Sequence, residues 1–199
     1  VDSMIEPIFK RCLPFLPQEL QVKGIKRKAS GLNARLRVYR YQADGEQTFR
    51  PHTDDSFPMS SCVDDRLIWD VTNGKMASVF TFLLYLTEEF DGGHTTFFQN
   101  QEKTNETSTA TVGAVTASVK PLSGSVLVFP QTCRTEPLSD ADGESAGLFT
   151  ADEEEFGFPI RTITDQLWMA PMHEGSPVKA KKGGRPKYVV RSDIMYSFE

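Results

Sequence analysis

Residues 79–86 read Val-Phe-Thr-Phe-Leu-Leu-Tyr-Leu, an almost unbroken apolar run. A short run of this kind, rich in aromatic and branched residues, predicts a β-strand that is buried on both faces. Residues 125–129, Ser-Val-Leu-Val-Phe, have the same character. The sequence therefore predicts a fold built around buried strands.

Further strands are expected on either side of this centre. Residues 36–41, Leu-Arg-Val-Tyr-Arg-Tyr, alternate apolar and charged side chains, which is typical of a half-buried strand. Glycine- and proline-containing turns separate further extended segments at 48–53, 94–98, 112–120 and 187–196. Residues 5–16 predict a short helix. Many short strands after one N-terminal helix favour a mainly β fold, a double-stranded β-helix (jelly roll) with a flanking N-terminal helix or helices.

Three polar segments interrupt the strand pattern. We expect residues 55–75 to form a long loop and residues 100–111 to form a flexible hairpin tip. Residues 131–170 read as a long acidic insertion, either a solvated loop or a lid that recognises a basic protein segment. The length of 199 residues indicates that the chain, 1–199, is a single domain that carries this insertion.

Composition narrows the classes of partner and compartment. The net charge of -5 argues against nucleic acid as a general partner. No stretch approaches the roughly 20 apolar residues that cross a membrane, and no signal peptide is visible. Cys12, Cys62 and Cys133 form no paired motif, which favours free thiols in a reducing compartment, cytoplasmic or nuclear. The basic cluster at 23–28 is expected to be a solvated face, with contact to an acidic partner as the alternative.

The chain has three histidines, and two of them fit a metal site. His52 and Asp54 are separated by one residue at the end of a predicted strand, so their side chains share a face. His173 lies far downstream, but a jelly roll pairs strands from both halves of the chain. Two imidazoles and one carboxylate form the ligand set of non-haem Fe(II) oxygenases. Surface polarity is the alternative for the His-x-Asp pair; Asp55 should face solvent, and His94 should be structural or near the substrate.

An ordered set of motifs resembles a known family. Along the chain occur Gly31-Leu-Asn-Ala-Arg-Leu-Arg-Val-Tyr-Arg-Tyr, His52-Thr-Asp, Tyr85-Leu, Gly92-Gly-His-Thr, Gly124-Ser-Val-Leu-Val-Phe, His173-Glu-Gly-Ser-Pro-Val and a strand led by Lys187. From about Leu32 to Tyr196, the chain resembles the prolyl 4-hydroxylase-like 2-oxoglutarate/Fe(II)-dependent dioxygenases. The resemblance implies that His52, Asp54 and His173 are the iron ligands and the catalytic centre.

The same resemblance implies where 2-oxoglutarate would bind. Lys187 matches the basic residue that pairs with the C5 carboxylate, and Tyr85 matches a tyrosine whose hydroxyl reaches that carboxylate. Tyr41 matches an aromatic residue near the entrance, while Leu83 and Thr95 match positions that line the pocket.

Two departures from the family pattern leave alternatives open. The interval from His173 to Lys187 is longer than is usual in the family, so Lys182 is an alternative anchor, and Arg191 could be a second contact or the true anchor. Asp193 stands where family members often carry a tryptophan, a change that affects the pocket wall.

The resemblance implies an enzyme, an oxidoreductase that requires Fe(II), 2-oxoglutarate and O2, with ascorbate as a further candidate. It would hydroxylate a peptidyl residue, foremost proline, and release succinate and CO2, so a protein or peptide substrate is expected. The alternatives are a hydroxylase of a free amino acid or another small molecule, and a catalytically silent binding module on the same fold.

Overall fold

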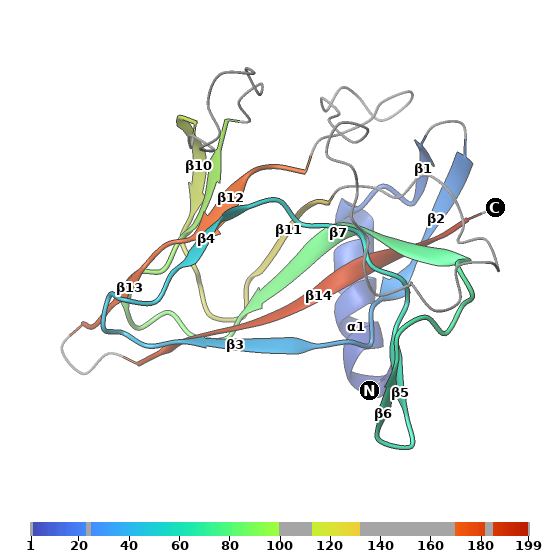
Figure 1. Ribbon diagram of the computed structural model, residues 1–199, viewed down its shortest axis with the longest axis horizontal. Coiled ribbons are helices and arrows are strands. Elements are labelled where there is room, and N and C mark those ends of the chain that lie inside the picture. Colours follow the sequence, from blue (N-terminus) through green and yellow to red (C-terminus); the bar gives the residue numbers. More distant parts are fainter. Residues whose placement is uncertain (1, 23–24, 100–112, 132–169, 182–184, 199) are drawn as a thin grey trace.

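The computed structural model describes residues 2–22, 25–99, 113–131, 170–181 and 185–198. One α-helix, α1 (Asp2–Cys12), and a 3-10 turn, η1 (Leu13–Phe15), precede the strands (Figure 1). The strands are β1 (Glu19–Val22), β2 (Ile25–Leu32), β3 (Arg37–Tyr41), β4 (Phe49–His52), β5 (Ser61–Val63), β6 (Arg66–Ile68), β7 (Met76–Tyr85), β8 (Asp91–Gly92), β9 (Thr95–Phe98), β10 (Val115–Val119), β11 (Val126–Pro130), β12 (His173–Gly175), β13 (Val178–Lys179) and β14 (Lys187–Phe198).

Two antiparallel sheets form the body of the molecule. The larger has the order β1-β2-β14-β7-β11, with β3 also paired to the first half of β14. The smaller has the order β10-β9-β12-β4. In each sheet, an early strand of the chain therefore pairs with a late one, β2 with β14 in the larger sheet and β4 with β12 in the smaller (Figure 1). This arrangement confirms the expected mainly β, jelly-roll fold with a flanking N-terminal helix.

The N-terminal helix supports the larger sheet from the side away from the smaller one. Apolar residues of α1 and the following turn, Ile5 and Leu16, pack in one buried cluster with Phe80, Phe82 and other residues of the sheet. Burial of this apolar surface is the main favourable contribution to stability here. The helix thus covers one face of the larger sheet, and the opposite face is available for a functional site.

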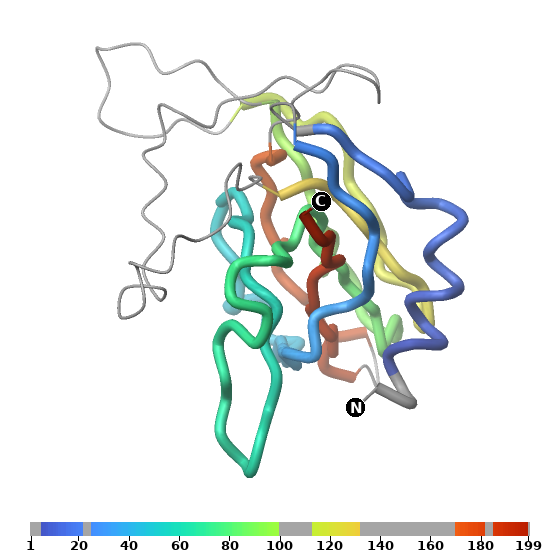
Figure 2. The backbone as a smooth tube through the Cα atoms, turned by 90° about the vertical axis from the view of Figure 1, so that its right-hand side faces the viewer, coloured from blue at the N-terminus to red at the C-terminus, as the bar shows by residue number. Residues whose placement is uncertain are grey.

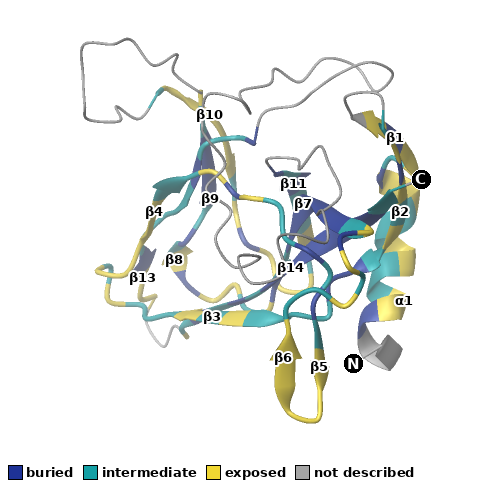
Figure 3. Ribbon diagram, turned by 45° about the vertical axis from the view of Figure 1, so that its right-hand side comes forward, coloured by how far each residue is buried: buried dark blue, intermediate teal, exposed yellow. Residues whose placement is uncertain are grey.

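The central strands β7 and β14 carry two different sets of side chains. Successive residues of a strand point to opposite faces. On β7, Phe80 and Phe82 face the helix, whereas Leu83 and Tyr85 line a cleft on the opposite face. Figure 3 shows β7 as largely buried, in agreement with the prediction for residues 79–86.

Two expectations for exposed segments were wrong. Residues 55–75 are not a plain loop, because β5 and β6 form a hairpin that projects from the body (Figures 2 and 3). Asp64 and Asp65 have φ of 49° and 59°, as the two central residues of a two-residue hairpin turn require. Both strands are largely exposed, so they lack the apolar alternation that reveals a half-buried strand.

The basic cluster at 23–28 is also not uniformly solvated. Within β2, Lys26 and Lys28 are exposed, but Arg27 is 1% exposed and its guanidinium lies over the Phe198 ring, 4.6 Å from the centroid. The alternating faces of a strand explain the difference, because the middle residue of the three points inward.

Several predictions fall outside the described residues. They concern the hairpin tip at 100–111, almost all of the acidic insertion at 131–170, Cys133 and Lys182. Cys12 and Cys62 are free thiols. Among the described residues, no helix is both long and apolar enough to cross a membrane.

Candidate metal centre

His52, Asp54 and His173 meet between the two sheets. β12 pairs with β4, and in that register His173 lies directly opposite His52. Asp54 follows β4 by two residues and is 3% exposed. One nitrogen of each histidine and one oxygen of Asp54 all lie within 4.8 Å of one another. The structure therefore brings together the three residues that the sequence marks as candidate iron ligands.

Backbone carbonyl groups orient both imidazoles. His52 Nδ1 lies 2.7 Å from the carbonyl oxygen of Arg50, and His173 Nδ1 lies 3.0 Å from that of Pro171. A carbonyl oxygen only accepts, so each Nδ1 carries the proton, and in a neutral ring each Nε2 then presents a lone pair. Burial lowers the pKa of His173, which keeps its ring neutral.

The imidazole nitrogens and carboxylate oxygens that converge at this point are all electron-pair donors. His52 Nε2 lies 3.4 Å from Asp54 Oδ1, and His173 Nε2 lies 3.6 Å from Asp54 Oδ2. Two lone pairs aimed at one carboxylate repel it unless a cation lies among them. A mid-size divalent metal such as Fe(II) takes imidazole and carboxylate ligands together, so this donor set fits it.

The surroundings of the two histidines differ. The His173 side chain is 6% exposed, and its ring packs on Phe129 at 4.6 Å between centroids. The His52 side chain is 26% exposed, and its ring packs on Phe49 at 4.3 Å. The site is therefore closed behind His173 and opens on the side of His52 and Phe49.

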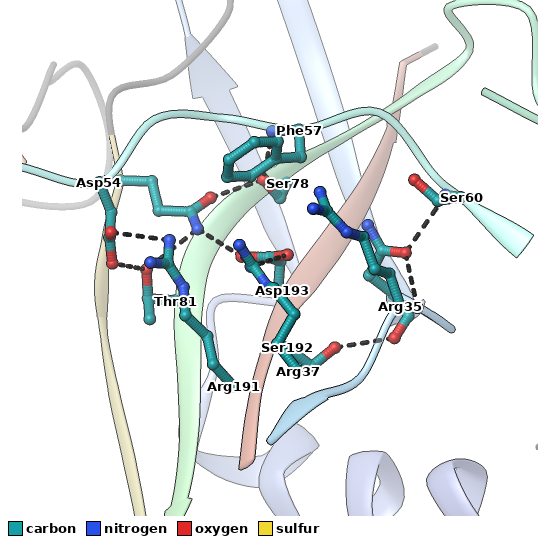
Figure 4. A network of polar contacts seen from close by, with 12 residues as sticks. Arg35, Arg37, Asp54, Phe57, Ser60, Ser78, Thr81, Arg191, Ser192 and Asp193 are labelled. Carbon is teal, nitrogen blue, oxygen red and sulfur yellow. Dashed lines mark hydrogen bonds and ion pairs between the residues drawn. The ribbon is translucent and has the colours of Figure 1, made fainter. Parts of the chain in front are cut away.

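Two donors hold the Asp54 carboxylate from different sides (Figure 4). The Thr81 hydroxyl donates to Oδ2 over 2.6 Å, and Arg191 Nη2 lies 2.7 Å from Oδ1. Burial alone would raise the pKa of Asp54, but the contact with His52, the positive charge of Arg191 and the hydroxyl of Thr81 outweigh it and hold that pKa well below its usual range. The Asp54 carboxylate is therefore ionised at neutral pH.

A cleft of about 460 Å³, with its open mouth included, extends from the three candidate ligands. Its walls include all the residues that the sequence assigns to 2-oxoglutarate among those described: Tyr41, Leu83, Tyr85, Thr95, Lys187 and Arg191. Lys187 leads β14, is 3% exposed and donates to the carbonyl oxygen of Gly93 over 2.7 Å. The Tyr85 hydroxyl is hydrogen-bonded to Thr95 Oγ1 at 2.7 Å.

The ammonium group of Lys187 suits an anionic ligand. It lies 5.1 Å from the ring centroid of Tyr41 and 5.5 Å from that of Tyr85. Burial lowers its pKa to about 8, and no carboxylate among the described residues forms an ion pair with it. An ammonium group has three protons to donate, so a buried one is suited to receive a ligand carboxylate. The cleft thus offers a metal site at one place and a cation for a carboxylate at another.

Arg191 has a contact that the sequence did not indicate. It shares the cleft with Lys187, as the period of two along β14 predicts. Its close partner, however, is Asp54, and its buried Nε has no hydrogen-bond partner among the described residues. Arg185 is an exposed ion-pair partner of Glu89, so Lys187 is the cation of the cleft among the described residues at the start of β14. His94 does not line the cleft.

Sequence reasoning missed the polar residues behind Asp54. Thr81 and Gln131 are fully buried, and Asp193 is 1% exposed and contacts Arg37 and Gln131 rather than the cleft. The side chain of Asp193 turns into the network behind the wall and does not line the cleft, and the effect of its standing in place of a tryptophan stays a prediction. A signal was present, since Thr81 interrupts the apolar run and the polar Gln131 comes directly after β11.

A comparison with protein-family models agrees with this geometry. The family model described as the 2OG-Fe(II) oxygenase superfamily matches residues 36–192. Among solved structures, the chain is similar to the viral collagen prolyl hydroxylase vCPH from Paramecium Bursaria Chlorella virus-1 in its 2OG complex, with 18% identity and a TM-score of 0.36. The similarity covers 86% of this chain and 60% of the viral chain. A comparison with curated protein sequences gave no match.

Proposed function

Because the chain belongs to the 2OG-Fe(II) oxygenase superfamily, we propose that it is a dioxygenase that hydroxylates a peptidyl residue, foremost proline. Membership makes it an oxidoreductase whose cofactor is Fe(II) and whose co-substrates are 2-oxoglutarate and O2. The observation that carries the proposal is the convergence of His52, Asp54 and His173 within 4.8 Å at the end of a cleft that also holds a buried lysine.

The three ligand candidates have complementary tasks in this proposal. His52, Asp54 and His173 hold Fe(II) and leave coordination positions free for 2-oxoglutarate and O2. When bound, the iron supplies the oxidation chemistry, in which 2-oxoglutarate is converted to succinate and CO2 and one oxygen atom enters the substrate. The protein contributes orientation, charge and the exclusion of water.

Lys187 is the proposed anchor of 2-oxoglutarate. Its ammonium group would meet the C5 carboxylate and stabilise a charge that is costly to bury alone. Burial raises the pKa of Tyr85, so its hydroxyl stays protonated and can donate to the same carboxylate. Tyr41, whose pKa burial raises to about 12, has its ring centroid 5.1 Å from the lysine nitrogen and also keeps its proton.

The open side of the cleft supports a peptide as the substrate. Phe49 is 37% exposed beside the accessible His52, and Tyr39 packs against Phe49 with 6.2 Å between ring centroids. Aromatic-lined grooves accept extended, proline-rich segments because such segments are already ordered before they bind. A sealed pocket would instead favour a free amino acid.

The test is turnover with a defined peptide set. The protein would be incubated with Fe(II), 2-oxoglutarate, O2 and peptides that contain or lack proline, with Asp54→Ala as the control. We expect succinate and a peptide heavier by one oxygen atom, both absent in the control. Oxygen transfer to free amino acids alone would support a small-molecule hydroxylase, and no 2-oxoglutarate consumption with any substrate would support a silent binding module.

A further inference from the structure

A chain of buried hydrogen bonds runs away from Asp54 on the side opposite the cleft (Figure 4). The Thr81 hydroxyl donates to Asp54 Oδ2, and Gln131 Nε2 donates to Thr81 Oγ1 over 3.0 Å. The second proton of the same amide nitrogen is donated to Asp193 Oδ1 over 2.7 Å. Thr81 and Gln131 are 0% exposed and neither lines the cleft. The contact of these groups with the site therefore runs through Asp54.

The direction of each hydrogen bond is determined by the far end of the chain. The backbone N–H of Phe57 can only donate, and it donates to Ser78 Oγ over 2.8 Å. Ser78 in turn donates its hydroxyl proton to Gln131 Oε1. With its oxygen engaged there, the amide of Gln131 presents nitrogen toward Thr81. Thr81 Oγ1 therefore accepts from Gln131, and its single proton is left for Asp54.

The amide nitrogen of Gln131 is also fixed by Asp193 and Arg37. Asp193 accepts from the amide, and Arg37 Nη2 lies 3.3 Å and 3.1 Å from its two carboxylate oxygens. These residues lie on three elements, β3, β14 and the segment after β11. The strand pairing of the larger sheet holds Arg37 and Asp193 in register. Turning the amide over would place its oxygen against the Asp193 carboxylate, which can only accept a hydrogen bond.

We propose that Thr81 and Gln131 are positioning residues that fix the orientation of the Asp54 carboxylate and so set the affinity of the site for its metal. The hydroxyl occupies one lone pair of Oδ2, and Arg191 holds Oδ1, so the carboxylate plane cannot rotate freely. Groups that orient a metal ligand in this way typically change metal affinity or activity by about 10–100-fold when removed. This inference rests on the proposed function, in which Asp54 is a metal ligand.

The experiment measures Co(II), an oxygen-stable stand-in for Fe(II), binding to the metal-free full chain by calorimetry and by its visible absorption spectrum. Thr81→Val keeps the shape but removes the hydroxyl, and we expect about 10–100-fold weaker binding with an altered spectrum. Thr81→Ser keeps the hydroxyl and should restore both. Gln131→Met, which leaves Thr81 in place but frees its hydroxyl to turn, should bind with intermediate affinity.

Thr96→Val is the matched control for a merely structural effect. Thr96 is also a buried strand threonine, but its hydroxyl lies near Ser118 and Ser176 and it does not line the cleft. Its substitution should lower thermal stability without changing Co(II) affinity. Wild-type affinity and spectrum in Thr81→Val, or an equal loss in Thr96→Val, would overturn the proposal. The proposed function fails separately, if the wild-type protein and Asp54→Ala bind Co(II) equally weakly.

Discussion

At the scale of single residues, the chemistry of the cleft depends on how burial changes each ionisable group. Asp54 keeps its charge because His52, Arg191 and Thr81 offset the cost of burial, whereas burial depresses the pKa of Lys187, with which no carboxylate of the described residues pairs. A buried cation without an anionic partner is costly to stability and is typical of a functional site. The cleft therefore contains a carboxylate, Asp54, whose charge neighbouring side chains stabilise, and an ammonium group, Lys187, whose charge a bound anion would stabilise.

The depressed pKa of Lys187 predicts a pH dependence for 2-oxoglutarate binding. The ammonium form exists below the pKa of about 8, and the dianion binds that form. Affinity should therefore be constant below pH 8 and fall by about tenfold per pH unit above it, as the lysine loses its proton. Equilibrium titration without oxygen at several pH values measures this slope.

Lys187→Arg is the control for that profile. A guanidinium group stays charged throughout this range, so any remaining affinity should not fall above pH 8. A wild-type affinity that stays constant from pH 7 to well above 8 would contradict the assignment of Lys187 as the anchor. Arg191 would then be the remaining cation of the described cleft.

At the scale of elements, the turn through β8 positions the anchor. Gly92 has φ of 72°, and a Cβ there would lie well inside contact distance of the Pro177 carbonyl oxygen. That carbonyl accepts from the N–H of Gly93, whose own carbonyl accepts from Lys187. The turn and the β13 segment beside it thus set where the ammonium group lies.

Gly92→Ala should therefore destabilise the protein and weaken 2-oxoglutarate binding together. Positive φ alone costs an ordinary residue about 1–2 kcal/mol. Gly124→Ala is the matched control, since its φ is 79° and nothing lies within 4 Å of the added Cβ. Denaturant unfolding should show a larger loss in Gly92→Ala than in Gly124→Ala, and only the former should change ligand affinity. Equal losses in both variants would mean that the contact with Pro177 is unimportant.

How far the sequence predicted these elements depended on burial. β7 was recognisable because its almost unbroken apolar run indicates two buried faces, and β14 was recognisable as the strand led by Lys187 that ends the motif order. The β5–β6 hairpin was missed because exposed strands show no alternation of apolar and polar residues. The inward position of Arg27 was missed because a run of charged residues does not reveal which of them faces the core. His52, Asp54 and His173 were found through ordered motifs, whereas Thr81 and Gln131 act through hydrogen bonds whose partners lie far away in the sequence.

At the scale of the whole molecule, two sheets bring an early and a late segment of the chain to one place. β4 and β12 pair in the smaller sheet, while β7 and β14 of the larger sheet supply Thr81, Lys187 and Arg191. Ligands that bind this junction contact both sheets, so they should stabilise the folded chain as a unit.

Metal and 2-oxoglutarate together should therefore raise the melting temperature. A ligand present at 100 times its Kd stabilises the folded state by about 2.7 kcal/mol. For a chain of this size each kcal/mol corresponds to roughly 2–4 °C, so the expected shift is about 5–10 °C. Scanning calorimetry with Co(II) and 2-oxoglutarate measures it, and Asp54→Ala should show no metal-dependent part. An equal shift in that variant would place the metal elsewhere.

The visible spectrum of the protein with Fe(II) and 2-oxoglutarate, recorded without oxygen, tests the central claim most directly. The account predicts a charge-transfer band that needs both components, is absent in His173→Ala and Asp54→Ala, and requires more 2-oxoglutarate in Lys187→Ala. Because no hydroxylation substrate is needed, the result does not depend on the proposed peptide. Absence of the band in the wild-type protein under saturating Fe(II) and 2-oxoglutarate, or its persistence in His173→Ala, would contradict the account.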